Sequence, residues 1–415
     1  MAAPGFSLSE IRNPKSEIIM RRWLENLEQF AIDVILERRH GPRAAFLRAL
    51  LYFHSLIYAR LVQLRLFLYR KRVFRERTLG CLVISIGNLT VGGTGKTPIV
   101  EKFARALQIG GRRVAILSRG YKSVPKPVKR KWRERFRRRN PDPPRIVSDG
   151  KSLLLDSLTA GDEPYMLANN LKDVIVLVDK DRAKSGLYAI REMKADTLLL
   201  DDGLQYLHLK HRLDIVLIDR QAPFGNEFLL PRGTLREPPR NLRRASYVFI
   251  TKSSGEPNDE LIGRIRRYNR TAEIIECAHQ PIHLQNVLTG ERAPLERLRD
   301  TYIGSICGIA APESFEGGLR KLGARIELAK RFIDHHRYTE AELQSFINRC
   351  VRRDVDMIVT TEKDAVRFPL LMKAEVPIYF LRVEIEILSG HESWEHCVAR
   401  ICQPQPMLSP ERFFS

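Results

Sequence analysis

The chain has 415 residues, 44% of them hydrophobic, a length and composition that allow two domains of ordinary size. Its formal net charge of +21 favours an anionic partner: nucleic acid, an acidic membrane surface or a phosphorylated lipid. The cysteines form no Cys-x-x-Cys pair, which excludes a disulfide or zinc framework and predicts reduced thiols in a cytosolic protein. The N-terminal residues lack the apolar core of a secretory signal.

Residues 1–75 are predicted to be an N-terminal helical segment that associates with a membrane. The most apolar part, 44–69, is interrupted by arginines, and its longest uncharged run is 49–59. That run is well short of the roughly 20 residues that cross a bilayer. We therefore expect a basic apolar helix that lies in the membrane interface, or one packed on the nucleotide domain with its arginines snorkelling.

The strongest local signal is a strand, a glycine-rich turn and a helix over 81–109. Glycines let backbone N–H groups close around phosphate oxygens, Lys96 can neutralise the outer phosphates, and the Thr97 hydroxyl can bind Mg²⁺. Thr90 stands where such a loop usually has its first glycine. The pattern predicts a nucleotide-phosphate site formed by Gly92, Gly93, Thr94, Gly95, Lys96, Thr97 and Pro98.

Two aspartates, Asp201 and Asp202, end an apolar strand that is predicted at 197–200. A phosphate-loop enzyme needs a carboxylate at the tip of a buried strand to hold Mg²⁺ or its waters. Paired aspartates otherwise form a turn or a helix cap. The strand context and the upstream phosphate loop favour the metal or nucleotide role.

Other polar residues lie at the ends of predicted elements, where open α/β sheets bind their ligands. Arg119 and Tyr121 follow a short strand, and Arg182 opens a helix. Asp162 and Glu163 are adjacent carboxylates before another short helix. These positions make all five residues candidates for the same site.

Two loops carry functional candidates without a predicted element. The basic insertion 122–145 is either a solvated surface loop or an anion-binding arm for membrane phosphates or nucleic acid. Its aromatic residues are too few for a base-stacking platform, so we expect no nucleic-acid partner. In the loop 228–238, Arg236 and Glu237 could contact phosphate and metal, or form a structural ion pair.

A second α/β segment follows a boundary that the sequence leaves open between 252 and 300. Strands and helices alternate in both segments, which predicts an α/β fold with a parallel sheet in each of two domains. The tail after Ser389 is expected to be a helix followed by a disordered end. The elements expected in the second segment are strands at 302–309, 325–329, 355–360 and 377–383 and helices at 312–322 and after Thr339.

This inventory suits phosphoryl transfer, which needs charge neutralisation and a positioned nucleophile. If the acceptor is a hydroxyl, a carboxylate near it can take the proton, and a histidine can orient that carboxylate. Asp162 with His335 fits these roles. His336 is an equally available neighbour, and a histidine that only caps structure is the ordinary alternative.

In their order and spacing, a set of motifs resembles the tetraacyldisaccharide 4′-kinase family over roughly 43–385. The motifs are Ile86–Pro98, Ser118–Tyr121, Gly161–Pro164, Asp201–Gln205, Leu230–Pro238, Asp334–His335 and Thr361–Val366.

The resemblance implies transfer of the ATP γ-phosphate to the 4′-hydroxyl of a tetraacylated glucosamine disaccharide 1-phosphate, giving lipid IVA. It implies ATP and Mg²⁺ as cofactors, a lipid substrate, and a peripheral place on the anionic cytoplasmic face of the bacterial inner membrane. We expect a monomer.

The family's fold is two α/β/α domains, the first of P-loop NTPase type. Here that predicts a kinase core at 76–255, a smaller domain at 256–395 and a tail at 396–415.

The resemblance also implies roles for single residues. The catalytic set would be Asp162 as general base, His335, Lys96 and Arg182. The metal set would be Thr97, Glu163, Asp201, Asp202 and Glu237. The substrate-binding set would be Arg119, Tyr121, Gln205 and Arg236. The insertion 122–145 and the first forty residues depart from the family pattern without touching a motif residue.

Two other functions fit the phosphate loop. A GTPase switch usually selects guanine with Asn-Lys-x-Asp, but the nearest candidate, Thr251-Lys252-Ser253-Ser254, lacks both the Asn and the Asp. A nucleic-acid-stimulated ATPase would use the basic insertion and would show steep salt dependence.

Overall fold

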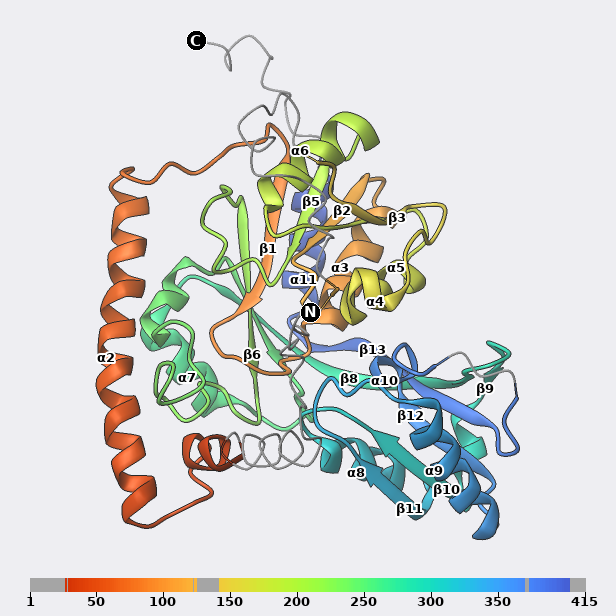
Figure 1. Cartoon of the computed structure of the whole chain (residues 1–415). Helices are drawn as coiled ribbons and strands as arrows, with labels where there is room; N and C mark the ends of the chain where they lie inside the picture. The colour runs from red at the N-terminus through yellow and green to blue at the C-terminus, as the bar shows by residue number, and fades with distance from the viewer. Residues whose placement is uncertain (1–26, 28, 122, 125–141, 370–372, 404–415) are drawn as a thin grey trace, which may run out of the picture. The chain divides into compact units, whose positions relative to one another are not determined.

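The computed structural model describes residues 27, 29–121, 123–124, 142–369 and 373–403 (Figure 1). The chain divides into two compact units: residues 1–67 with 224–238, and residues 68–223 with 239–415. The first part of the N-terminal segment predicted at 1–75, most of the insertion 122–145 and the end of the C-terminal tail lie outside the described residues. The cysteines have free thiols, as expected.

The smaller unit is built on helix α2 (Pro42–Arg70), which supports the loop 224–238. The Tyr58 hydroxyl donates a hydrogen bond of 3.0 Å to the Arg236 carbonyl. The Tyr52 ring packs edge-on against Phe228 at 6.0 Å. Large apolar side chains on α2 are exposed. Among the described residues, α2 is the one helix that is long and apolar enough to cross a membrane, on length and composition alone.

The larger unit contains one mixed sheet in the order β11-β10-β12-β13-β8-β7-β6-β1-β5-β2-β4-β3, with β9 paired to β8 (Figure 1). Most neighbours are parallel, whereas β13 with β8, β8 with β9 and β3 with β4 are antiparallel. The strands are β1 (Leu82–Asn88), β2 (Val114–Ser118), β3 (Arg145–Asp149), β4 (Ile175–Val178), β5 (Thr197–Asp201), β6 (Leu213–Asp219), β7 (Tyr247–Thr251), β8 (Glu273–Asn286), β9 (Arg292–Ala293), β10 (Tyr302–Cys307), β11 (Arg325–Arg331), β12 (Met357–Thr361) and β13 (Ile378–Ser389).

Helices cover both faces of this sheet. Ile84 and Ile86 of β1 belong to the core cluster of α3, α5 and α11, and Val83 belongs to the cluster of α6. Helices on both faces explain why every residue of β1 is buried. The helices are α3 (Lys96–Ile109), α4 (Ser157–Ala160), α5 (Asp162–Asn170), α6 (Arg182–Met193), α7 (Asp259–Tyr268), α8 (Pro312–Lys321), α9 (Glu340–Arg352), α10 (Glu362–Ala365) and α11 (His391–Cys402), with short 3₁₀ turns η2 (Pro239–Arg244) and η3 (Leu295–Leu298).

The predicted α/β fold is confirmed, and the two predicted sheets are continuous with each other. Long strands β8 and β13 make the join, because β8 pairs with β7 at its start and with β13 over most of its length. Neither β8 nor α7 was predicted from the sequence. Both lie between 252 and 300, where the position of the domain boundary was left open. Nor was β3 predicted, which begins where the basic insertion was expected to end. A helix after Ser389 is confirmed as α11.

A buried polar junction ties three helices to β13. The Arg382 guanidinium donates to both carboxylate oxygens of Glu362 in α10, at 3.0 and 2.8 Å, and to Glu101 in α3. The Asn170 amide at the end of α5 donates to Glu362 at 2.6 Å and to Glu101 at 3.3 Å. Burial raises the pKa of Glu362, against the charge of Arg382. The junction therefore fixes α3, α5 and α10 relative to one another.

Replacing Arg382 by Met should strongly destabilise the fold, because Glu362 would lose its buried counter-charge and Glu101 would keep, among the described residues, only the exposed Arg105. We expect the free energy of unfolding in urea to fall by about 3–5 kcal/mol. Arg325→Met is the control, since Arg325 pairs with Asp300 on the surface, and its urea midpoint should hardly move. Equal midpoints for the two variants would contradict the structural role of the junction.

Candidate active site

The phosphate loop is organised by Asn88, the last residue of β1. Lys96 at the start of α3 donates to the Asn88 side-chain oxygen at 3.3 Å. The Asn88 amide donates to the Thr94 hydroxyl at 3.0 Å and to the Thr90 hydroxyl at 3.5 Å. Thr90, which replaces the usual glycine, is therefore a partner in this network. Gly95 has φ 77°, a left-handed conformation that favours glycine before the first turn of α3.

A group of carboxylates lies beside Lys96. Asp201 is fully buried at the end of β5, where the Ser118 hydroxyl donates to Oδ2 at 3.0 Å. Its Oδ1 has no hydrogen-bond partner among the described residues. Burial, helped by the nearby charges of Glu163 and Asp202, raises the pKa of Asp201 to about 7, against the charge of Lys96. Lys96 Nζ lies 3.6 Å from Asp202 Oδ1.

This carboxylate group fits a divalent cation. A cation that binds between these acids supplies a partner for the Asp201 Oδ1 atom and reduces the repulsion between the carboxylates. Within the described ranges, no three His, Cys, Asp or Glu side chains form a complete metal cage. Mg²⁺ commonly takes one or two carboxylates and completes its shell with water and substrate phosphates.

Arg182 and Gln205 pack around the same strand ends. The Arg182 side chain is buried at the start of α6, where it donates to the Asp201 carbonyl at 3.4 Å and lies 4.8 Å from the Tyr206 ring. Burial lowers the pKa of Arg182, and the charge of Arg119 adds to this. Gln205 donates to the Asn88 carbonyl at 3.1 Å. These two residues therefore belong structurally to the phosphate-loop side of the site.

A second cluster surrounds Asp162, the buried first residue of α5. Its Oδ2 accepts a hydrogen bond of 2.7 Å from Arg367 Nε and lies 3.4 Å from His335 Nδ1. Its Oδ1 accepts a hydrogen bond of 3.0 Å from Arg337. Burial raises the pKa of Asp162, but the contacts with His335, Arg367 and Arg337 outweigh it and leave the pKa below its usual value. The carboxylate is therefore ionised at neutral pH.

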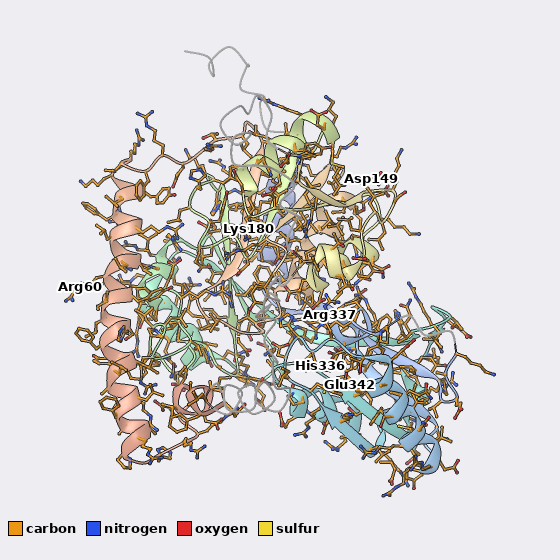
Figure 2. All side chains as sticks on the ribbon, viewed as in Figure 1. Arg60, Asp149, Lys180, His336, Arg337 and Glu342 are labelled. Carbon is orange, nitrogen blue, oxygen red and sulfur yellow. The ribbon has the colours of Figure 1, made fainter. Side chains whose placement is uncertain are left out.

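The two adjacent histidines differ in environment. His335 faces Asp162, with the Tyr121 ring 5.7 Å away. His336 stacks on Phe332 at 4.3 Å, and its Nε2 lies 3.1 Å from Glu342, which closes the capping box of α9. Figure 2 shows His336 beside Glu342. The structure therefore brings His335, and not His336, to the predicted base.

Lys363 in α10 connects the two clusters. Its Nζ lies 3.3 Å from Glu163 Oε1 and 3.4 Å from His335 Nε2. Glu163 follows Asp162 in the chain, and its charge acts on Asp201. The Asp162 cluster and the carboxylates of the phosphate-loop side are thus in electrostatic contact.

Four residues of these clusters were not predicted from the sequence to have a role in the site. Asn88 and Lys363 lie inside the quoted motifs, but their partners come from distant parts of the chain. Arg367 follows the last quoted motif directly, and Arg337 follows the two histidines. For Arg367 and Arg337, the only sequence pattern that could have predicted a role was a basic residue that directly follows a motif.

Arg236 and Glu237 belong to the smaller unit, where Glu237 is buried. Burial and the charge of Glu237 raise the pKa of Tyr58 in that unit. The predicted contacts of Arg236 and Glu237 with phosphate and metal stay predictions.

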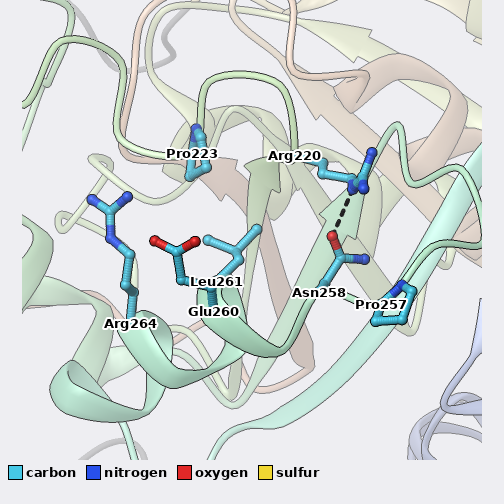
Figure 3. A pocket seen from close by; sticks show the side chains of 7 residues that line it. All are labelled: Arg220, Pro223, Pro257, Asn258, Glu260, Leu261 and Arg264. Carbon is cyan, nitrogen blue, oxygen red and sulfur yellow. Dashed lines mark hydrogen bonds between the residues drawn. The ribbon is translucent and has the colours of Figure 1, made fainter.

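A shallow pocket of about 290 Å³ lies at the start of α7 (Figure 3). Arg220 Nε donates to the Asn258 side chain across it at 2.6 Å. Its lining residues, Arg220, Pro223, Pro257, Asn258, Glu260, Leu261 and Arg264, include none of the predicted site residues.

Comparison with known proteins identifies the family. A family model described as tetraacyldisaccharide-1-P 4′-kinase matches residues 47–403. The chain belongs to the tetraacyldisaccharide 4′-kinase family. A relative with that name from Syntrophus aciditrophicus (strain SB) is 40% identical over 361 residues, 84% of this chain and 91% of the relative. Another relative with that name, from Anaeromyxobacter sp. (strain K), is 37% identical over 379 residues. The match covers 90% of this chain and 96% of the relative.

A solved structure supports the same assignment at the level of the fold. It is the "apo" form of the family member LpxK from Aquifex aeolicus in complex with ATP, with 28% identity and a TM-score of 0.66. The match covers 86% of this chain and 99% of that chain. As a tetraacyldisaccharide 4′-kinase, the chain is a phosphotransferase that acts on an alcohol group.

Asn88→Ala should weaken binding of a nucleoside triphosphate, because Lys96 and Thr94 lose their shared partner. A charge-assisted hydrogen bond from Lys96 and a neutral one to Thr94, at about 1.5 and 1 kcal/mol, predict a roughly thirtyfold to hundredfold rise in Kd. Isothermal titration calorimetry would measure it. Thr90→Ser, which keeps the hydroxyl, is the matched control. An unchanged Kd in Asn88→Ala would rule out the organising role of Asn88.

Proposed function

We propose that this chain transfers the γ-phosphate of ATP to the 4′-hydroxyl of a tetraacylated glucosamine disaccharide 1-phosphate, with Asp162 as the general base. The observation that carries this proposal is the buried, ionised Asp162 carboxylate, which is adjacent in sequence to Glu163 and thereby next to the phosphate-loop acids. Family membership supports the lipid A precursor as the acceptor.

ATP would bind with its phosphates on the phosphate loop. The Aquifex relative was solved with ATP, which supports ATP as the donor here. Lys96 would neutralise the outer phosphates, and Arg182 would add positive charge beside the end of β5. The residues that would hold Mg²⁺ are Thr97, Asp201 and Asp202, with Glu163 near them. When bound, Mg²⁺ would offset the charge of the β- and γ-phosphates.

In the proposed transfer step, the 4′-oxygen of the acceptor forms a bond to the γ-phosphorus, and the bond between that phosphorus and the β–γ bridging oxygen breaks. The hydroxyl proton passes to Asp162, and ADP leaves with the electron pair of the broken bond. Tyr121, whose ring lies 5.7 Å from that of His335, would contact the sugar acceptor, as would Gln205 and Arg119, which also follows β2.

The enzyme would work as a peripheral protein on the anionic cytoplasmic face of the inner membrane. The exposed apolar side chains of α2, together with its arginines, suit a helix that lies in the headgroup region. The strongly positive net charge favours the same surface. A GTPase switch or a nucleic-acid-stimulated ATPase has no supporting observation of comparable weight, because the family model covers 47–403.

Asp162→Asn should keep the shape of the site and remove the base. Because a base acts mainly in the transition state, kcat should fall by about 100-fold to 10,000-fold, with the Kd for ATP within about threefold. The assay follows label from γ-labelled ATP to detergent-dispersed tetraacyldisaccharide 1-phosphate. Asp149→Asn, at the exposed end of β3, is the control and should match the wild type. Near-normal turnover in Asp162→Asn would remove Asp162 from this role.

Replacing the exposed apolar residues Phe46, Phe53 and Leu61 of α2 by Ser should weaken membrane binding. Each large side chain contributes about 1.5–3 kcal/mol when fully buried in an apolar phase, so the triple variant should sediment with anionic phospholipid vesicles at least tenfold less well. Activity on a short-chain, water-soluble acceptor should be retained. Unchanged vesicle binding would show that α2 is not the membrane contact.

A further inference from the structure

Two arginines hold the Asp162 carboxylate, one on each oxygen, and they differ sharply in burial. Arg367 binds Oδ2 at 2.7 Å, and its side chain has no exposed surface. Arg337 binds Oδ1 at 3.0 Å, and its side chain is 35% exposed. Figure 2 shows Arg337 in the segment that precedes α9. The two oxygens of the proposed base are therefore not equivalent.

The Arg367 guanidinium is fixed from several directions. Its Nη1 donates to the Gly308 carbonyl and to Asp364 Oδ1, both at 3.1 Å. Asp364 is itself held by the Tyr338 hydroxyl at 3.1 Å and by the Thr361 hydroxyl at 2.6 Å. Each of these partners is buried or half-buried. A guanidinium bound in this way cannot turn without breaking several hydrogen bonds away from water.

Arg367 also contacts the His335 ring. Arginine only donates hydrogen bonds, and Arg367 Nη2 lies 3.1 Å from His335 Nδ1. Arg367 Nε and His335 Nδ1 both face Asp162 Oδ2, at 2.7 and 3.4 Å. Arg367 is therefore the closer partner of Oδ2, and it also contacts the ring that faces the same oxygen.

Lys363 contacts the other nitrogen of the ring. Lys363 Nζ is 3.4 Å from Nε2, longer than the contact of Arg367 with Nδ1, and its charge is paired with Glu163 at 3.3 Å. The imidazole is thus held between two cations, of which only Arg367 is fully buried.

We infer that Arg367 is a positioning residue for the proposed phosphoryl transfer: it locks Asp162 through Oδ2 and sets the His335 ring, which leaves Oδ1 to take the acceptor's proton. Arg337, at the exposed side, occupies Oδ1 in the free enzyme and gives way when the hydroxyl arrives. The inference rests on the proposed role of Asp162 as base. Its physical basis is that a misplaced catalytic group costs much of the rate even when binding is unchanged.

The test compares Arg367 with Arg337, because both bind the same carboxylate. In the label-transfer assay, Arg367→Gln should lower kcat by about 100-fold or more, with KM for ATP and lipid within about threefold. Arg337→Gln should lower kcat by less than about fivefold, since Arg337 is only partly buried and leaves Oδ1 when the acceptor hydroxyl binds. If Arg367→Gln does not fold, as judged by circular dichroism, Arg367→Lys decides. Lysine keeps the positive charge but cannot form the several directed hydrogen bonds of a guanidinium, so kcat should fall about tenfold in this variant.

A double variant separates positioning from general stability. In the Asp162→Asn background, adding Arg367→Lys should cause no further loss of kcat, because Arg367 acts through Asp162. A merely structural role would multiply the two losses. That result, or kcat within threefold of wild type in Arg367→Lys, would overturn the inference while leaving the proposed function intact. Failure of the wild-type enzyme to label the lipid would overturn both.

Discussion

The site depends on the buried junction in which Arg382 pairs with Glu101 and Glu362. Each helix that meets there carries a functional side chain in its first turn: Lys96 in α3, Asp162 in α5 and Lys363 in α10. A buried ion pair stabilises little by itself, but breaking it leaves an uncompensated charge in a medium of low dielectric constant. The three helix starts are therefore held at fixed separations, as a reaction between two bound molecules requires.

The parallel core of the sheet supplies the second constraint. β5, β1 and β6 run in the same direction, so the phosphate loop and Asp201 leave the sheet at one edge. At that edge, Asp201 Oδ1 has no hydrogen-bond partner among the described residues, and burial together with the charges of Glu163 and Asp202 raises the pKa of this carboxyl. A buried carboxylate oxygen without a partner in this part of the chain is suited to a substrate that arrives with a cation. On the acceptor side the balance differs, because Asp162 is fully compensated by arginines before any substrate binds.

The sequence predicted the parts of this site that depend on local patterns. The phosphate loop is encoded in consecutive residues, and Asp201 is recognisable because it ends an apolar strand. The partners of Asp162 and Glu101 could not be predicted, since Arg367 and Arg382 are 205 and 281 residues away along the chain. β8 escaped prediction because one half is only partly buried and Pro281 interrupts it. That proline lies where the β8–β13 register shifts, a place where a strand tolerates it.

The most direct test of the account is the structure of the enzyme with Mg²⁺, a non-hydrolysable ATP analogue and the disaccharide 1-phosphate. The account predicts the 4′-hydroxyl within hydrogen-bond distance of Asp162 Oδ1 and in line with the γ-phosphorus. Arg367 should remain on Oδ2, and Arg337 should have moved away from Oδ1. An acceptor hydroxyl bound by another side chain, with Asp162 still held by both arginines, would contradict it.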